Sequence, residues 1–487
     1  MQKVWSISGR SIAVSALALA LTACQSMRGP EPVVSASIPS SYTNASGTSV
    51  AEQGYKNFFA DQRLLQVLDM ALENNRDLRT AALNIQRAQQ QYQITENNQL
   101  PTIGASGSVL RQVTPTRDPN NPYSSFNVGL GVTAYELDFW GRVRSLKDNA
   151  LDTYLATASA RDATQIALIS QVAQAWLNHS YASANLKLAD QTLKAQLESY
   201  NLNKKRFDVG IDSEIPVRQA QISVETARND VANYKTQVAQ AKNLLNLLVG
   251  EPVPASLLPT QRVTRITNTT SIGSGLPSDL LNNRPDVRAA EYKLSAAGAN
   301  IGAAKARLFP TISLTGTAGY ASTDLNNLFR SGNFAWSIGP SLDLPIFDWG
   351  TRKANIKISE TDQQIALSDY EKSIQSAFRE VNDALAVRQN IDDRLAAQRR
   401  LVNATNTTYK LSNARFRAGI DSYLSVLDAQ RTSYSAEQGL LLLEQANLNN
   451  QVELYKTLGG GVKTQTTDEV VKQPSSSEVK YNKADKK

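Results

Sequence analysis

The chain has 487 residues, a formal net charge of +7 and a mean hydropathy of −0.34. This hydropathy excludes a polytopic helical membrane protein, and the dispersed charges lack the basic stripe of a nucleic-acid-binding surface. The only histidine, His179, stands within a helical pattern, and the sequence has no metal-spaced cluster, nucleophile elbow or phosphate loop. We therefore expect no enzyme, no metal or other cofactor, and no nucleic-acid partner.

The first segment, residues 1–23, has the pattern of a bacterial secretory signal. Lys3 and Arg10 supply the positive start, the apolar stretch follows over 11–21, and the segment ends in Leu-Thr-Ala before Cys24. Small residues before a cysteine are typical of a lipobox, which predicts lipidation of Cys24; the alternative is an ordinary signal peptide with a chance cysteine. Cys24 is the only cysteine, so it forms no disulfide within the chain. No aspartate follows it at the positions that retain lipoproteins in the inner membrane, which favours the outer membrane.

The rest of the chain contains two copies of one unit at a constant offset of 209 residues. The sequence Gly-Ile-Asp-Ser, for example, occurs at 210–213 and again at 419–422. Further matches at this offset are Leu-Pro-Thr-Ile at 100–103 with Phe-Pro-Thr-Ile at 309–312, Trp140-Gly141 with Trp349-Gly350, Arg206-Phe207 with Arg415-Phe416, Ala220-Gln221 with Ala429-Gln430, and Gly250 with Gly459. Because one register holds over about 150 residues, the repeat is structural and not accidental.

Each unit opens with a predicted pair of strands, over 101–138 and 310–347. Even positions of 312–320 and 334–346 are apolar or small, whereas the odd positions are mostly small or polar. This period of two is typical of a transmembrane barrel strand, with lipid on one face and water on the other; a soluble half-buried sheet is the alternative. Phe126 belongs to the apolar face, whereas Ala335, its counterpart 209 residues later, belongs to the polar face. One extra residue in a strand reverses the facing of the side chains that follow, so we predict a bulge near Ala134.

Long helices follow the strands. Residues 141–206 and 350–415 contain no proline, and at about 1.5 Å per residue each would extend about 100 Å. A glycine turn ends each, and shorter helices return over 214–249 and 423–458. Helices also precede the strand pairs, over 61–99 and 278–308, and we expect 214–249 to stack end to end on 278–308. Sparse apolar residues in these helices predict narrow coiled-coil seams. A simple extended coiled coil would show the same pattern, so the helices alone do not distinguish it from a helical barrel.

The predicted fold class is mixed, all-α plus transmembrane β, in two tandem structural repeats. Four strands per protomer cannot close a barrel, so we expect a homotrimer with a twelve-stranded outer-membrane β-barrel. A long periplasmic α-helical coiled-coil barrel would continue it, with an α/β equatorial collar. The predicted segments are a signal peptide at 1–23, a lipidated extended segment at 24–60, a helix at 61–100, strand pair 1 at 101–138, helical hairpin 1 at 139–250, an equatorial segment at 251–277, a helix at 278–309, strand pair 2 at 310–347, helical hairpin 2 at 348–460, and a disordered or equatorial tail at 461–487.

Several motifs together resemble the outer-membrane efflux channel family, in particular its lipoprotein branch. They are the lipobox at Cys24, Phe-Trp-Gly at 139–141, Asp-Trp-Gly at 348–350, Arg-Pro-Asp at 284–286, Ala-Arg-Leu-Phe-Pro at 306–310, Arg-Phe-x-x-Gly at 206–210 and 415–419, and Leu-Asp-Ala-Gln-Arg at 427–431. The resemblance covers nearly the whole chain. It implies a passive trimeric duct of a multidrug efflux pump, partnered by a periplasmic adaptor and an inner-membrane resistance-nodulation-division transporter.

The resemblance also implies two sets of site residues at the periplasmic helix tips. The predicted gate consists of Asp428, Arg431, Arg417 and Phe416, with Asp428 as an inward acidic ring. The predicted adaptor-docking tips consist of Arg206, Gly210, Asp212, Arg415, Gly419 and Asp421. A solvated helix end is the alternative for Asp428, and plain turn chemistry is the alternative for the tip residues.

Two other functions use the same pattern of elements. A protein-export channel would have the same tube, although the lipobox argues against it. A purely structural periplasmic coiled coil would have the same helices but no barrel. The substrates and the particular adaptor are not encoded in any motif of the sequence.

Overall fold

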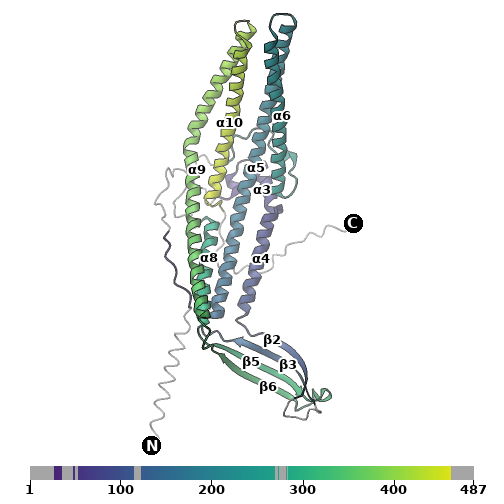
Figure 1. Ribbon diagram of the computed structural model, residues 1–487, viewed down its shortest axis with the longest axis vertical. Helices are drawn as coiled ribbons and strands as arrows, with labels where there is room; N and C mark the ends of the chain where they lie inside the picture. The colour runs from purple at the N-terminus through teal and green to yellow at the C-terminus, as the bar shows by residue number, and fades with distance from the viewer. Residues whose placement is uncertain are drawn as a thin grey trace. The chain divides into compact units, whose positions relative to one another are not determined.

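The computed structural model describes residues 27–35, 48–49, 53–113, 122–268, 272–273, 281 and 283–461 (Figure 1). The described chain divides into two compact units. The first contains 27–35, 84–157 and 289–371, and the second contains 48–83, 158–288 and 372–461. The predicted signal peptide, Cys24 and the tail from 462 onward lie outside the described residues. Within the described segments, no helix is long and apolar enough to cross a membrane.

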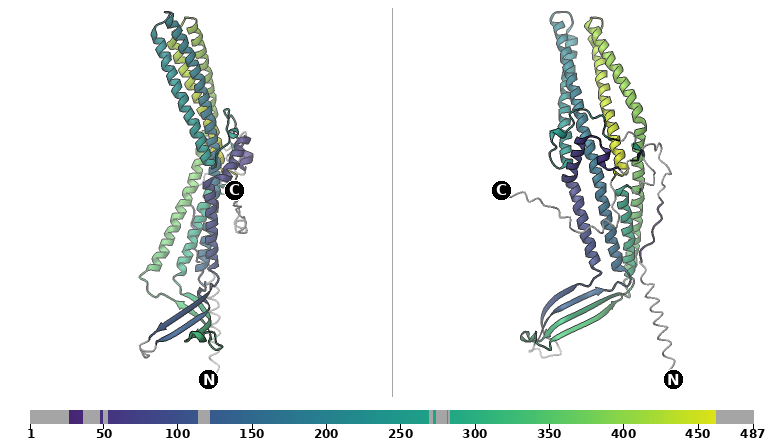
Figure 2. Two further views of the ribbon diagram at one scale, coloured as in Figure 1. Left: turned by 90° about the vertical axis from the view of Figure 1, so that its right-hand side faces the viewer. Right: turned by 180° about the vertical axis from the view of Figure 1, so that it is seen from behind.

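The first unit contains an antiparallel sheet of four strands. These are β2 (Ile103–Gln112), β3 (Tyr123–Glu136), β5 (Thr311–Ser322) and β6 (Phe334–Asp343), in the order β2-β3-β5-β6. Figure 2 shows this sheet from two further directions. The two predicted strand pairs therefore join through β3 and β5. Strands β2 and β6 are the sheet edges, and neither pairs there with another described strand.

The two faces of the sheet differ in chemistry, as the alternation predicted. In the β5–β6 register, Trp336 lies opposite Ala318 on the apolar face. On the other face, the hydroxyl oxygens of Ser313 and Ser341 are 2.7 Å apart, as are those of Thr317 and Ser337. Trp336 is 70% exposed. A sheet with large exposed apolar side chains on one face and paired hydroxyls on the other is suited to lie between lipid and water.

The predicted bulge in β3 is confirmed. The β3–β5 register shifts between Val132 and Tyr135, and the intervening Ala134 has a φ of +50°. The backbone N–H of Ala134 donates to the Thr315 hydroxyl at 3.2 Å. The extra residue reverses the facing of β3, so that Tyr135 lies opposite Leu314 on the apolar face.

Gly129 and Gly319 lie opposite each other in the β3–β5 register. A Cβ added at Gly319 would lie 2.2 Å from the Val128 carbonyl oxygen, whereas a Cβ at Gly316 would meet nothing closer than 3.7 Å. We expect Gly319→Ala to destabilise the sheet by about 1–3 kcal/mol, as overpacking does. The control Gly316→Ala should have little effect. Thermal unfolding followed on heat-modifiable gels checks this, and equal midpoints for the two variants would contradict it.

Both long helices form as predicted. Helices α5 (Arg142–Asp208) and α9 (Thr351–Arg417) each contain 67 residues. They return through α6 (Glu214–Val249) and α10 (Tyr423–Thr457), and the two hairpins lie side by side in the second unit (Figures 1 and 2). The remaining main helices are α3 (Gln62–Asn74), α4 (Arg76–Asn97) and α8 (Pro285–Ala306), preceded by the short α2 (Tyr55–Phe58).

Two predicted helices have different bounds. The helix expected over 61–99 is divided at Asn75, whose backbone is extended. The buried Asn75 side chain accepts a hydrogen bond from the Leu78 N–H and donates one to the Leu248 carbonyl, each at 2.8 Å. It thus caps the start of α4 and the end of α6. In the helix expected over 278–308, residues 281 and 283 are helical, Arg284 interrupts the helix, and α8 begins at Pro285, consistent with the bias of a residue before proline against helical geometry.

The same joint recurs in the second repeat with different chemistry. Arg284 stands 209 residues after Asn75, and its guanidinium donates to the Thr457 carbonyl at 3.3 Å, at the end of α10. Arg284 is buried and forms ion pairs with Asp286 at 2.6 Å and with Glu380 at 2.9 Å. Burial by itself lowers the pKa of Arg284, but its hydrogen bonds to Asp286 and Glu380 and their charges raise the pKa above its ordinary value.

These joints correct the predicted stacking of helices. Helix α6 ends at the start of α4 and not at the start of α8, which instead receives the end of α10. The matching lengths of 214–249 plus 278–308 suggested the wrong pair. The partner is decided by which side chain reaches the free carbonyls at each helix end, and that depends on tertiary structure.

The predicted equatorial segment packs on α5 within the second unit. The Trp176 indole N–H donates to the Leu257 carbonyl at 3.0 Å, and the Tyr181 hydroxyl donates to the Val263 carbonyl at 2.9 Å. A 3-10 turn, η1 (Ala255–Leu257), lies in this segment. Strands β1 (Thr48–Ser49) and β4 (Ile272–Gly273) form a short parallel pair. Loop carbonyls thus bind buried aromatic donors of the long helix.

We expect Arg284→Met to destabilise the folded protein by about 2 kcal/mol, because it removes charge-assisted hydrogen bonds to two carboxylates and a helix end. The matched control is Arg379→Met, since Arg379 is exposed and lies 3.9 Å from its partner Asp383. Denaturant unfolding followed by tryptophan fluorescence measures both. A control as damaging as Arg284→Met would refute the importance of the joint.

Candidate functional site

The two hairpin tips have the same turn geometry. Gly210 and Gly419 have φ values of +75° and +78°, a left-handed conformation in which glycine is favoured. The Ile211 N–H donates to the Arg206 carbonyl at 2.9 Å, and the Ile420 N–H donates to the Arg415 carbonyl at 3.0 Å. These bonds satisfy carbonyls at the helix ends, so the chain can reverse sharply into α6 and α10.

An arginine–aspartate clamp closes each turn. The guanidinium of Arg206 donates to the Asp212 carboxylate at 2.5 Å, and that of Arg415 donates to the Asp421 carboxylate at 2.6 Å and 3.1 Å. The hydrogen bond from Arg415 lowers the pKa of Asp421 below its ordinary value. The structure therefore brings the predicted docking residues together, but it pairs these four charges within their own turns.

Exposed apolar side chains at the tips were not predicted. They are Val209, Ile211 and Ile215 at the first tip and Ile420 and Leu424 at the second. Apolar residues at a turn in water suggest contact with a partner protein. The sequence does show these apolar residues beside the glycine turns, and that pattern could have predicted a partner-binding surface there.

Phe416, one of the predicted gate residues, is buried between the two hairpins. It is 5% exposed and packs with Tyr423, Val426 and Leu427 of its own hairpin and with Ala220 of the other. The guanidinium carbon of Arg206 lies 5.2 Å from the centre of its ring. Phe416 therefore joins the two tips, and its place in the gate stays a prediction.

The other three predicted gate residues are exposed. Asp428 and Arg431 lie on α10, between positions whose side chains are buried, and Arg417 lies at the end of α9. In the described part of a single chain, none of the three forms an ion pair. Leu427 and Ala429, on either side of Asp428, are buried, so Asp428 points away from the hairpin core.

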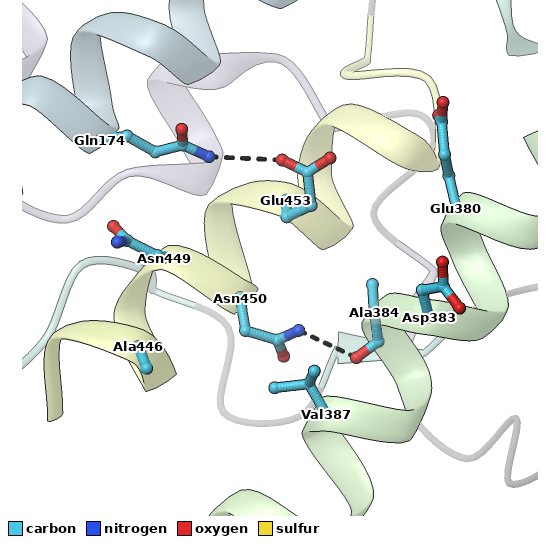
Figure 3. Close-up of a pocket in the computed structure, with 9 residues that line it drawn as sticks. All are labelled: Gln174, Glu380, Asp383, Ala384, Val387, Ala446, Asn449, Asn450 and Glu453. Atoms are coloured by element: carbon cyan, nitrogen blue, oxygen red, sulfur yellow. Dashed lines mark hydrogen bonds between the residues drawn. The ribbon is translucent and has the colours of Figure 1, made fainter. Parts of the chain in front are cut away.

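A cavity of about 540 Å³ lies among α5, α9 and α10 in the second unit (Figure 3). Its acidic residues are already paired: Glu380 with Arg284, Asp383 with Arg379, and Glu453 with Lys456. Glu453 also accepts a hydrogen bond from Gln174 at 3.3 Å. Among the described residues, no group of three or more His, Cys, Asp or Glu side chains is arranged to hold a metal ion. The cavity is thus a polar groove in the helical wall.

A sheet with one lipid-compatible face, in a chain with two long helical hairpins, defines a class of outer-membrane channel subunits. The chain belongs to the outer membrane efflux protein family, whose model matches it twice, over residues 67–251 and 276–460. The two matches are offset by 209 residues at both ends, which confirms the internal repeat.

Individual relatives cover most of the chain. ArpC, an antibiotic efflux pump outer membrane protein of Pseudomonas putida, is 43% identical over 447 residues, which are 90% of this chain and 92% of that protein. CusC, a cation efflux system protein of Escherichia coli, is 38% identical over 416 residues, or 84% and 88% of the two chains. The open-state crystal structure of the MtrE outer membrane channel of Neisseria gonorrhoeae matches with a TM-score of 0.82 and 39% identity, covering 91% of this chain and 100% of that chain.

We expect Asp421→Asn to loosen the second tip, because it weakens the clamp to Arg415. Trypsin should then cleave the α9–α10 turn after Arg415 or Arg417 several-fold faster than in the wild type. The matched control is Asp428→Asn, which removes an unpaired charge and should leave cleavage unchanged. Limited proteolysis with mass spectrometry measures both, and equal rates for the two variants would mean that the clamp does not hold the turn.

Proposed function

We propose that three copies of this chain form the exit duct of a multidrug efflux pump in the outer membrane. The observation that carries this is the four-stranded sheet, whose edges β2 and β6 are both open while one face exposes large apolar side chains. In lipid each unpaired backbone group costs several kcal/mol, so the edges must pair with other copies.

The lining of the sheet favours three copies over two. A dimer would give eight strands, and side chains fill the interior of so small a barrel. A trimer gives twelve strands around a lumen faced by hydroxyls such as those of Ser313, Thr317 and Ser341. Small polar side chains leave room for water, so solutes pass without a bound cofactor and without catalysis.

The N-terminal segment supports a lipid anchor on Cys24. Residues 27–35 run along the first unit, the one that contains the sheet. Arg28 donates to the Ser295 carbonyl at 2.8 Å, and the Gly29 N–H donates to the Gly298 carbonyl at 3.2 Å. Further on, the Ser35 N–H donates to Glu371 at 2.7 Å. A lipid on Cys24 would therefore lie four residues before Arg28, which is hydrogen-bonded to the unit that contains the sheet.

The helical hairpins serve as the periplasmic part of the duct. Asp428, repeated three times at one level, would form a ring of carboxylates that favours cations. Arg431, one turn further along α10, and Arg417 at the end of α9 supply the opposing charges of a closed gate. The exposed apolar residues around Gly210 and Gly419 supply the surface for a periplasmic adaptor, which links the duct to a resistance-nodulation-division transporter.

Substrates are selected elsewhere in the pump. ArpC is named for antibiotic efflux and CusC for cation efflux, yet both align with most of this chain. One architecture thus accompanies different cargoes. The small hydroxyl side chains on this face of the sheet support a passive conduit.

Single-channel conductance in planar bilayers tests this proposal. The wild type should show a small conductance that prefers cations. Asp428→Ala should lower the cation-to-anion permeability ratio by about twofold or more, whereas Arg417→Ala and Arg431→Ala should enlarge the conductance. Asp393→Ala, which removes an exposed charge on α9 further from the tip, is the control. If folded trimers of the wild type and of all three gate variants show no conductance, the gate assignment is wrong. If the protein does not insert into bilayers, the channel proposal is wrong.

A further inference from the structure

A second cavity, also of about 540 Å³, lies between α9 and α10 of the second hairpin. Its lining includes three leucines, Leu401, Leu442 and Leu443, and among the described residues that line it Arg394 is the charged one. It shares Ala446 with the polar cavity shown in Figure 3, so the two cavities adjoin along α10. Unlike its neighbour, this cavity combines apolar side chains with a single positive charge.

Two of the three leucines are exposed to solvent. Leu401 is 48% exposed and Leu442 is 70% exposed, whereas Leu443 is buried against Ile391 and Leu395. The cavity therefore lies where the core of the hairpin meets open apolar surface. Apolar surface of this kind, set into a hollow, is typical of a place that a ligand covers.

The apolar character is specific to the second repeat. At the equivalent positions of the first hairpin, 209 residues earlier, Thr192 and Asn233 stand in place of the two exposed leucines, and Asp230 stands in place of Gly439. The two hairpins share one backbone plan, yet only the second has leucines at these positions. Formation of the helices does not require them, because polar residues occupy the same positions in the first hairpin.

Gly439 gives the cavity its room. A glycine inside a helix costs about 1 kcal/mol relative to alanine, and Gly439 lies in the interior of the 35-residue α10. A Cβ added there would lie 2.8 Å from the side-chain nitrogen of Gln398. That nitrogen donates to the Ala436 carbonyl at 2.8 Å. Glycine thus lets Gln398 bridge α9 and α10 and leaves the surface beside the bridge hollow.

The cavity faces away from the equatorial segment. Glu444 of α10 pairs with Arg262 of that segment at 3.0 Å, and Leu442, two residues earlier, lies on the opposite side of the helix. Leu442 also follows Asp428 by fourteen residues, close to four helical turns, so the two side chains share one face of α10. In the proposed duct, where the equatorial segment forms a collar around the tube, this face borders the lumen.

We propose that the cavity is a binding site in the lumen wall for amphiphilic acids, molecules with a naphthalene-sized apolar body and one anionic group. The apolar body packs on Leu401 and Leu442, and the guanidinium of Arg394 pairs with the anion. Arg394 is exposed, and among the described residues of one chain it forms no ion pair, so its charge is available. A hollow of several hundred Å³ with a mostly apolar lining and one charged group is typical of a small-molecule site.

The proposal rests on the proposed duct and adds a place where solutes pause on their way out. Binding must be weak, because a solute that stays would obstruct the passage. The site therefore retains amphiphilic acids briefly and does not select the substrates of the pump. The competing role for Leu401 and Leu442 is a contact with a neighbouring copy, which would cover them in the trimer.

Equilibrium dialysis of purified full-length trimers against naphthalene-2-sulfonate, with detergent micelles alone as the blank, tests the site. The wild type should bind one probe molecule per copy. Leu401→Thr/Leu442→Asn, which installs the residues of the first repeat, should weaken binding about fivefold or more, because it removes apolar contact. Arg394→Asn should weaken binding of the sulfonate several-fold and leave binding of the neutral naphthalene-2-sulfonamide unchanged.

The matched control is Leu411→Thr. Leu411 is a leucine of α9 that is 61% exposed and does not line the cavity, so this variant should bind the probe as the wild type does. If the double leucine variant binds as well as the wild type, or if Leu411→Thr loses binding equally, the inference is wrong. Light scattering reports the assembly of each variant. If the double variant no longer forms trimers, the two leucines hold copies together and the inference is also wrong.

Dialysis does not require conduction, so the site and the duct can fail separately. Trimers that conduct in bilayers but bind no probe would refute the site and leave the duct in place. Trimers that bind the probe with the expected dependence on Arg394 and the two leucines, but form no channel, would support the site and refute the duct.

Discussion

The structure depends on the hydrogen-bonding demand of a sheet edge. Each of the four strands carries backbone donors and acceptors, and the order β2-β3-β5-β6 satisfies them only in the interior of the sheet. The membrane face adds a second demand, because Trp336 and its apolar neighbours need lipid while Ser341 and Thr317 need water. Closure with further copies meets both demands together. The bulge at Ala134 serves the second demand, because it reverses which face the side chains of β3 point to while β5 continues without interruption.

The helical part shows how one repeated backbone plan is stabilised by two kinds of chemistry. At the first joint a neutral amide, Asn75, bonds to the end of α6 and the start of α4. At the second joint Arg284 bonds to the end of α10 and also forms ion pairs with two carboxylates. A buried charge requires partners, so the second repeat carries an ionic cluster that the first does not need. Repeats that have the same length and register can therefore differ in electrostatics and in their response to substitution.

The tips combine a rigid turn with exposed surface. Glycine geometry and the clamps Arg206–Asp212 and Arg415–Asp421 fix the chain reversal without help from a partner. The docking role of these charged residues stays a prediction, and exposed apolar residues such as Ile211 and Ile420 lie beside them in the same turns. Phe416 locks one hairpin to the other, which leaves Asp428, Arg417 and Arg431 as exposed charges available to a gate.

The sequence by itself determined the features that depend on local pattern: the 209-residue repeat, the two-faced strands, the bulge at Ala134, the two long helices and the glycine turns. Each follows from periodicity or from one residue's backbone preference, which neighbours in sequence fix. Tertiary structure alone decided the break at Asn75, the pairing of α6 with α4 and of α10 with α8, and the burial of Phe416. Those features depend on which carbonyl or ring a side chain meets across a long separation in sequence. Helix lengths and motif matches do not predict these long-range contacts, because several pairings of helices agree with them equally well.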